Sequence, residues 1–201
     1  MPRRLLDFGD DAVLLECADL AEALGLAPLV RAAVPEVLEV VPGARTLLLR
    51  LAGPLPAPAR TRLLTLVPVP AGSGVGRTVT LAVAYDGADL AEVGTLTGLG
   101  VDGVVAAHTG QTWTVGFCGF APGFGYLVGE DERLRVPRRV VPRTRVPAGA
   151  VGLAGPFSGV YPCSGPGGWQ LLGRTSTPLW DLDADPPALL QPGMRVRFEV
   201  R

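Results

Sequence analysis

Glycine and proline limit what this chain can fold into, above all between His108 and Asp181. They interrupt that stretch every few positions, so neither a long helix nor a long flat sheet fits it. The same stretch contains the only histidine, nine of the twelve aromatic residues, and six arginines from Arg133 to Arg145. A hydrophobic core has no use for this combination of rigid turns, flat rings and guanidinium groups. We therefore expect the functional surface to lie here.

The composition excludes several kinds of site. The 201 residues include no lysine, so all 18 basic residues are arginine. This absence rules out a Walker-type phosphate loop, Schiff-base chemistry and a Ser-Lys dyad. The three cysteines show no CxxC spacing and there is one histidine, so we expect no metal site and no disulfide framework.

The charge and hydropathy patterns limit the partners. A net charge of −1 provides no overall attraction to nucleic acid or to an anionic membrane. No apolar run approaches the roughly 18 residues that a bilayer span requires, and the N-terminus shows no signal-peptide pattern. We expect no nucleic-acid or membrane partner, and a cytoplasmic location.

The chain is expected to form two domains. Residues 1–67 predict a small α/β domain whose one aromatic residue is Phe8, which suits a scaffold or docking role. Residues 68–77 are rich in proline, glycine and serine and predict a linker. The glycines at 72–76 resemble a phosphate-binding loop only in composition. The strands expected in the first domain are 12–17, 37–41 and 46–51, and the helices are 19–33 and 58–67.

The second domain, residues 78–201, is expected to begin with a strand and two short helices. Residues 78–84 show an alternating pattern that is rich in β-branched side chains, and this pattern predicts the strand. Asp89 and Glu92 stand three residues apart and predict a capping box at the start of the first helix. Asp102 is expected to cap the second helix.

Beyond these helices the pattern changes to short apolar runs separated by glycine and proline. Several short strands with such turns indicate a β-barrel or a β-sandwich, and the whole chain is predicted to be α+β. The expected strands are 112–117, 126–128, 150–153, 168–172 and 194–200.

His108 is the first candidate for chemistry. At the C-terminal end of a helix the dipole favours the charged ring, which could bind an anion or transfer a proton near neutral pH. The alternative is a histidine that only satisfies the last carbonyl groups of the helix. No acidic residue is placed to orient the ring as in a Ser-His-Asp triad.

The loop from Gly116 to Tyr126 is the second candidate. Its four glycines and Pro122 hold a convoluted backbone, while its rings provide flat apolar walls. Such a loop can line a pocket and present backbone N–H groups to an anionic or carbonyl ligand. The alternative is a tight barrel corner whose rings fill the core. The candidate binding residues are Phe120, Pro122, Gly123, Phe124 and Tyr126.

The segment 137–147, PRRVVPRTRVP, is the third candidate. Arg138 and Arg143 each follow a proline, which keeps the segment extended and projects both side chains at defined positions. Planar guanidinium groups suit bidentate binding of carboxylate or phosphate. The alternatives are a solvated basic loop paired with the acidic residues 130–132, or an RNA-binding arm, which needs broader positive charge.

The fourth candidate is the segment 164–175, SGPGGWQLLGRT. Gly167 and Gly168 allow a close approach to a ligand, Trp169 provides a platform, and Arg174 provides an anion contact. A β-hairpin turn explains the same residues equally well.

Taken together, in this order, these segments resemble the KipI family, whose members are also known as the B subunit of 5-oxoprolinase or allophanate hydrolase subunit 1. The resemblance is strong over residues 79–201 and covers the first domain in outline. Trp113 stands where tyrosine is usual, and 152–158 is looser than the family pattern, which leaves the substrate open. The matching residues are His108, 119–126, the two Pro-Arg pairs, 146–149, 161–162, 166–169, 173–175 and 192–198.

The resemblance implies a small α/β domain followed by a cyclophilin-like β-barrel. It also implies, as partner, a second cyclophilin-like subunit (the C subunit of 5-oxoprolinase, or allophanate hydrolase subunit 2) and a possible third protein, the A subunit. Such complexes cleave 5-oxo-L-proline to L-glutamate at the expense of ATP. The isolated chain is expected to be inactive.

The family implies a composite site at the contact with the partner. Arg138, Arg143 and Arg174 would neutralise a substrate carboxylate or a phosphorylated amide, and His108 would donate a proton or contact the anion. No set of carboxylates for magnesium is evident, so ATP would be shared with, or held by, a partner subunit. The alternatives are a subunit of urea catabolism, related to urea carboxylase or allophanate hydrolase, and an inhibitor of a histidine kinase.

Overall fold

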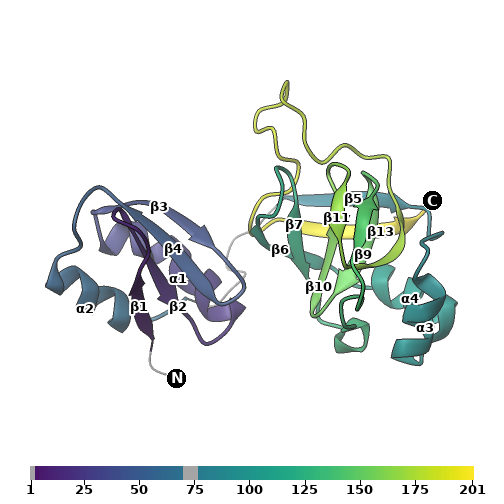
Figure 1. Ribbon diagram of the computed structural model, residues 1–201, viewed down its shortest axis with the longest axis horizontal. Coiled ribbons are helices and arrows are strands. Elements are labelled where there is room, and N and C mark those ends of the chain that lie inside the picture. Colours follow the sequence, from purple (N-terminus) through teal and green to yellow (C-terminus); the bar gives the residue numbers. More distant parts are fainter. Residues whose placement is uncertain (1–2, 70–76) are drawn as a thin grey trace. The chain divides into compact units, whose positions relative to one another are not determined.

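The computed structural model describes residues 3–69 and 77–201 (Figure 1). The chain divides into two compact units, Met1–Val75 and Gly76–Arg201. Most of the linker predicted at 68–77, including its glycine run, lies outside the described residues. At its beginning, the Val69 amide donates to the carbonyl oxygen of Gly25 at 3.1 Å, so residue 69 is held against the first unit.

The first unit is an antiparallel sheet with the strand order β1-β2-β4-β3 and two helices. The expected strands and helices are all present, and Asp19 caps the first helix, because its carboxylate accepts from the Glu22 amide at 2.8 Å. β1 was not predicted, since its four residues RLLD show no strand pattern. The elements are β1 (Arg4–Asp7), β2 (Ala12–Glu16), α1 (Leu20–Ala33), β3 (Val37–Pro42), β4 (Thr46–Leu51) and α2 (Ala57–Thr65).

The second unit is built on a seven-stranded sheet with the order β12-β9-β10-β7-β6-β13-β5. All of its pairs are antiparallel except β13 with β5. A bridge between Ala84 and Arg174 joins the two edge strands, so the sheet closes into a barrel. The strands are β5 (Thr78–Val83), β6 (Trp113–Cys118), β7 (Gly125–Val128), β8 (Arg143–Val146), β9 (Ala150–Ala154), β10 (Phe157–Val160), β11 (Gly165–Gly167), β12 (Gln170–Arg174) and β13 (Arg195–Val200).

The predicted fold class, α+β with a small first domain and a cyclophilin-like β-barrel, is confirmed. Three strands of the second unit were not predicted. β11 consists of Gly165–Gly167, and glycine and proline disfavour strands in isolation. It forms because it pairs with β8, at a position where the register shifts.

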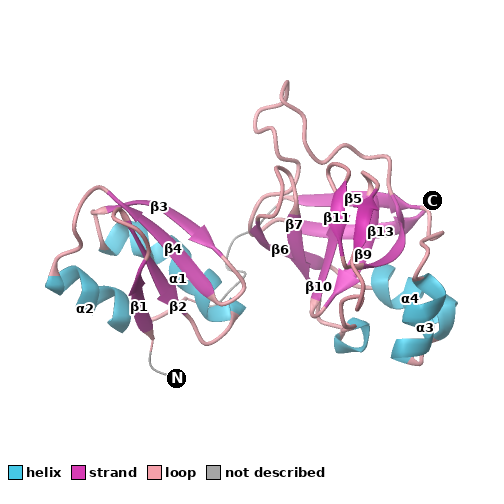
Figure 2. Ribbon diagram, in the orientation of Figure 1, coloured by secondary structure: helices cyan, strands magenta, loops and turns pink. Residues whose placement is uncertain are grey.

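Two helices, α3 (Leu90–Thr97) and α4 (Gly100–Thr109), lie together at one end of the barrel (Figure 2). A short 3-10 helix, η1 (Glu132–Leu134), follows β7. α4 begins before Asp102, which lies in its first turn and does not cap it. Among the described residues no single helix is long and apolar enough to span a bilayer, and only α3 and α4 together, bent by 92°, reach that length.

Candidate functional site

Two arginines of the segment 137–147 meet at one buried carboxylate. Asp89 precedes α3, and its side chain is only 3% exposed. Its Oδ1 accepts from Arg139 at 2.6 Å and from Arg143 at 2.7 Å, while its Oδ2 accepts from the Leu171 amide at 2.7 Å. The extended loop, the start of α3 and strand β12 are therefore held together by one charged group.

The capping box predicted at Asp89 is wrong. Its side chain makes no capping bond, because it turns toward the arginines instead. Burial alone would raise the pKa of this carboxyl, but hydrogen bonds from Arg143 and Leu171 and the charges of Arg143 and Arg139 outweigh burial and lower it. Asp89 is therefore ionised at neutral pH, and it neutralises part of the charge of Arg143.

Arg138 lies on the exposed side of the same loop and, within the described residues, makes no ion pair or side-chain hydrogen bond. Its charge and that of Arg143 act on the Tyr161 hydroxyl. Burial raises the pKa of Tyr161 to about 12, and the two guanidinium groups oppose this effect. The charges of Arg138 and Arg143 thus both act on Tyr161, a residue that we did not predict as part of the site.

The aromatic residues of the second candidate form a packed cluster. The rings of Phe124, Tyr161 and Trp169 are almost fully buried and meet edge to face, with centroids 5.4 Å apart for Phe124–Trp169 and 5.5 Å for Phe124–Tyr161. Tyr126 contacts Phe124 from the side at 5.0 Å. The expected aromatic-walled hollow is therefore wrong for these rings, which fill the space between them.

Phe120 lies at the outer edge of this cluster. Its ring is 61% exposed, and its edge meets the ring of Tyr161 at a centroid distance of 6.0 Å. Its backbone has a φ of +71°, an unusual conformation for a residue with a side chain. Pro122 is exposed beside it, and a Cβ at Gly123 would lie 2.8 Å from the Leu179 carbonyl oxygen. The loop therefore presents Phe120 to solvent on a tightly held turn.

Gly167 and Gly168 allow the arginine loop to approach this cluster. A Cβ at Gly167 would overlap the Tyr161 hydroxyl, so only glycine leaves room for it there. The Gly168 carbonyl oxygen accepts from the Arg139 amide at 2.8 Å, and the carbonyl oxygen of Trp169 accepts from Arg143 at 3.5 Å. The glycine pair thus allows a close approach of the protein's own groups, and the predicted approach to a ligand stays a prediction.

His108 lies apart from the arginines, in the core of the barrel. Its ring has no exposed surface; Nδ1 is 2.7 Å from the Tyr85 hydroxyl and Nε2 is 2.8 Å from the Ser158 hydroxyl. The ring of Phe198 lies at 4.3 Å. Burial lowers the pKa of His108 to about 3, so the ring is neutral and the expectation of a charged ring is wrong. The structure gives no route from this ring to a ligand.

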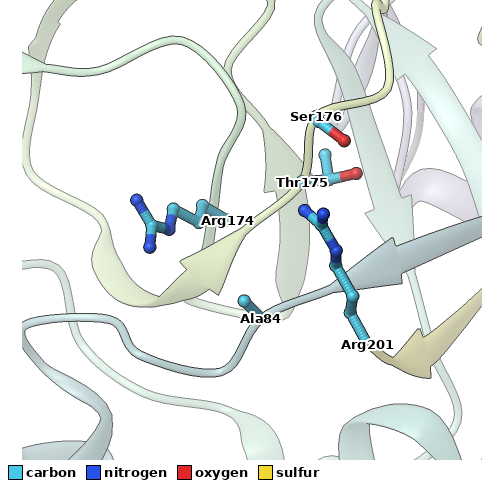
Figure 3. A pocket seen from close by; sticks show the side chains of 5 residues that line it. All are labelled: Ala84, Arg174, Thr175, Ser176 and Arg201. Carbon is cyan, nitrogen blue, oxygen red and sulfur yellow. The ribbon is translucent and has the colours of Figure 1, made fainter.

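Arg174 also lies apart, at the far end of β12. It pairs with Asp86 at 2.8 Å and borders an open cavity of about 530 Å³ (Figure 3). In Figure 3 the guanidinium groups of Arg174 and Arg201 point in different directions. The backbone of Arg174 pairs with Ala150, which also bonds to the Tyr161 amide, but the Arg174 side chain turns to Asp86. Thr175 and Ser176 also line this cavity; Tyr161, Arg138 and Arg143 are not among its described lining residues.

Of the predicted residues, the structure groups Arg143 with the glycine turn and the aromatic cluster, and Arg138 is exposed on the same loop. It encloses His108 in the core and pairs Arg174 with Asp86 at the end of β12. Asp89 and Tyr161 complete the group. Across residues 3–69 and 77–201, no three His, Cys, Asp or Glu side chains gather in a way that could hold a metal ion.

Comparisons with known proteins agree with this architecture. The family model described as carboxyltransferase domain, subdomain C and D, matches residues 3–190. A protein of Escherichia coli O157:H7, named as the B subunit of 5-oxoprolinase, is 42% identical over 171 residues, which cover 82% of this chain and 78% of that protein.

Two crystal structures extend the comparison. That of TTHA0988 matches with a TM-score of 0.76 and 38% identity over 94% of this chain, which spans only 39% of TTHA0988. That of the K. lactis urea amidolyase matches with a TM-score of 0.78 over 99% of this chain and 15% of the amidolyase. Because identity to the amidolyase is 19%, that likeness concerns the fold alone.

Proposed function

Because this chain belongs to the carboxyltransferase subdomain C and D family, we propose that it is a subunit of an ATP-dependent 5-oxoprolinase, which opens 5-oxo-L-proline to L-glutamate. The observation that carries this proposal is the 42% identity to a protein named as the B subunit of 5-oxoprolinase over 82% of the chain. The fold likeness to urea amidolyase is too distant in sequence to favour urea catabolism.

The group around Tyr161 suits the proposed substrate. 5-Oxo-L-proline carries one carboxylate and one lactam carbonyl oxygen, and both accept hydrogen bonds. Arg138 provides an uncompensated cation, and Arg143 provides a second one whose orientation Asp89 holds. Charge-assisted hydrogen bonds of this kind contribute roughly 1.5–3 kcal/mol each. In the proposed role, Arg138 binds the substrate carboxylate, and Arg143 orients that carboxylate as a second cation.

The same group does not fit a magnesium–nucleotide complex. The carboxylate nearest to the arginines, Asp89, is buried and already accepts from Arg139, Arg143 and the Leu171 amide, so it is not available to bind a metal. ATP supplies the free energy for lactam opening, and we assign its binding to a partner subunit. We derive no step through ATP on this chain.

The surface around the group supports a composite site. Val140 is 99% exposed and Val141 is also exposed, so the arginine loop itself presents two apolar side chains, and Phe120 is exposed beside Tyr161. Such exposure next to a charged site suits a surface that is covered in a complex. We propose the second cyclophilin-like subunit for that partner, with a third protein, the A subunit, completing the complex. A cytoplasmic location stays a prediction.

Reconstitution of the three-subunit complex tests the proposal. Release of L-glutamate from 5-oxo-L-proline and ATP is expected only when all three proteins are present. The double variant R138A/R143A should lower kcat/KM at least 100-fold. R145A is the matched control, because Arg145 lies in the same loop but bonds to Ser164 at 3.0 Å.

A wild-type complex without glutamate release would overturn the proposed function. Full activity of R138A/R143A would leave the function standing and remove the arginine assignment. Inhibition of a histidine kinase by the isolated chain would instead favour the regulatory alternative.

A further inference from the structure

The hydroxyl group of Tyr161 has no partner in the described part of the chain. The residue is only 1% exposed, and buried polar groups in folded proteins are nearly always hydrogen-bonded. Two other side-chain atoms, Arg139 Nε and Gln170 Oε1, are enclosed and unpartnered. The Tyr161 oxygen is not one of these enclosed atoms, and the residue as a whole keeps 1% of its surface exposed.

The backbone amide and carbonyl groups of Tyr161 are both hydrogen-bonded, so only its hydroxyl group lacks a partner. Its carbonyl oxygen accepts from the Gly149 amide at 2.7 Å, and its amide donates to the Ala150 carbonyl oxygen at 2.9 Å. Its ring packs on Phe124 and Trp169. A phenylalanine would fill the same space and make the same contacts, so packing does not account for the hydroxyl.

The Tyr161 hydroxyl packs directly against the backbone of β11. A Cβ at Gly167 would overlap the hydroxyl, so only glycine fits beside it. Gly167 is opposite Arg143 in the β8–β11 pair. The arginine loop thus approaches the hydroxyl across a residue that has no side chain.

All the groups that meet here are hydrogen-bond donors. Burial raises the pKa of Tyr161 to about 12, so its O–H stays protonated at any physiological pH. The guanidinium groups of Arg138 and Arg143 are always protonated. A ligand at this position must therefore offer an oxygen that carries, or gains, negative charge: a carboxylate, or a carbonyl oxygen under attack.

We propose that the Tyr161 hydroxyl donates a hydrogen bond to an oxygen atom of the small acid substrate, between Arg138 and Arg143. This inference rests on the proposed function and adds to it a substrate-contacting residue. The site thereby combines two positive charges with one neutral donor held in place by the aromatic cluster.

The variant Y161F tests this role, because it removes the hydroxyl and keeps the ring. In the reconstituted complex we expect kcat/KM for 5-oxo-L-proline to fall tenfold to a hundredfold. We also expect the melting temperature of the chain to change by less than about 2 °C, because the lost hydroxyl has no partner inside the protein. If Tyr161 had a purely structural role, Y161F would not lower activity while leaving stability unchanged.

Y85F is the matched control. The Tyr85 hydroxyl is bonded to His108 in the core, so its loss should lower the melting temperature by about 4 °C or more and leave kcat/KM within twofold. G167A provides a second variant, since its methyl group takes the place of the Tyr161 hydroxyl and should reproduce the loss of activity. Calorimetric binding of 5-oxo-L-proline to the complex gives a second readout.

The outcomes separate this inference from the proposed function. If R138A/R143A loses activity while Y161F binds and turns over substrate within twofold of wild type, the inference is wrong and the proposed function stands. If the wild-type complex neither binds nor cleaves 5-oxo-L-proline, the proposed function fails, and the inference fails with it.

Discussion

The barrel domain buries two polar clusters, and they differ in how their hydrogen bonds are satisfied. In the core, His108 is neutral and both ring nitrogens face hydroxyl groups, those of Tyr85 and Ser158. At the other cluster, Asp89 is charged and satisfied by three donors, while the nearby Tyr161 hydroxyl has no partner in the described part of the chain.

This difference separates structural from functional polar groups. A buried group whose bonds are all made within the protein stabilises one packing arrangement and has nothing to offer a ligand. A buried donor left open beside positive charge keeps its bond for a ligand. By this criterion the single histidine, the residue that stands out most in the sequence, has a structural role, and Tyr161 is assigned to the proposed site.

The largest effect on stability is expected at Asp89. D89A leaves two partly buried arginines without their shared counter-charge and the Leu171 amide without an acceptor. We expect the free energy of unfolding of the barrel to fall by about 3 kcal/mol, measured by urea denaturation. D86A is the control, because its carboxylate pairs with Arg174 on the surface. Equal losses for the two variants would show that the buried network stabilises the barrel no more than an exposed ion pair does.

The pH dependence of stability gives a further test of the Asp89 network. The folded pKa of Asp89 is below its ordinary value of 3.8. The stabilisation from this carboxylate is therefore fully present above about pH 4 and is lost as the pH falls through the lowered pKa. In D89N this acid-dependent loss should be absent, as measured by urea denaturation at successive pH values.

His108 should make the free energy of unfolding depend on pH in a less acidic range than Asp89 does. Its pKa is about 3 in the folded chain against 6.5 ordinarily, so the unfolded chain takes up the proton first. Its stabilisation is fully present above pH 6.5 and declines at about 1.4 kcal/mol per pH unit toward pH 3, which amounts to about 2 kcal/mol at pH 5. H108Q should flatten this slope. A wild-type slope already flat between pH 7 and 5 would contradict the buried, neutral ring.

The smallest effect is expected at Arg174. Its side chain and that of Asp86 are both largely exposed, so R174A should change the free energy of unfolding by less than about 1 kcal/mol. Because the Arg174 side chain is already paired with Asp86, R174A should also leave kcat/KM within threefold. A loss as large as that of R138A/R143A would show that the cavity in Figure 3 belongs to the site.

Much of the fold was predictable because the relevant signals are local. Alternating β-branched residues marked β5, and the turn at Pro42-Gly43 marked the hairpin of β3 and β4. β8 and β11 escaped prediction because their stability comes from pairing with each other. The same limit applied to the capping box, since nothing near Asp89 in sequence shows that arginines 50 and 54 residues away compete for its carboxylate.

By itself, the sequence determined the kind of site: a glycine-held, arginine-rich, aromatic surface without lysine or a metal-ligand motif. Only the tertiary structure decided which of these residues meet. Local propensities act within a few residues, whereas closure of the barrel brings together Asp89, the arginine loop and Tyr161 from distant parts of the chain. Closure also places His108 in the dry interior, where burial makes the neutral ring the stable form.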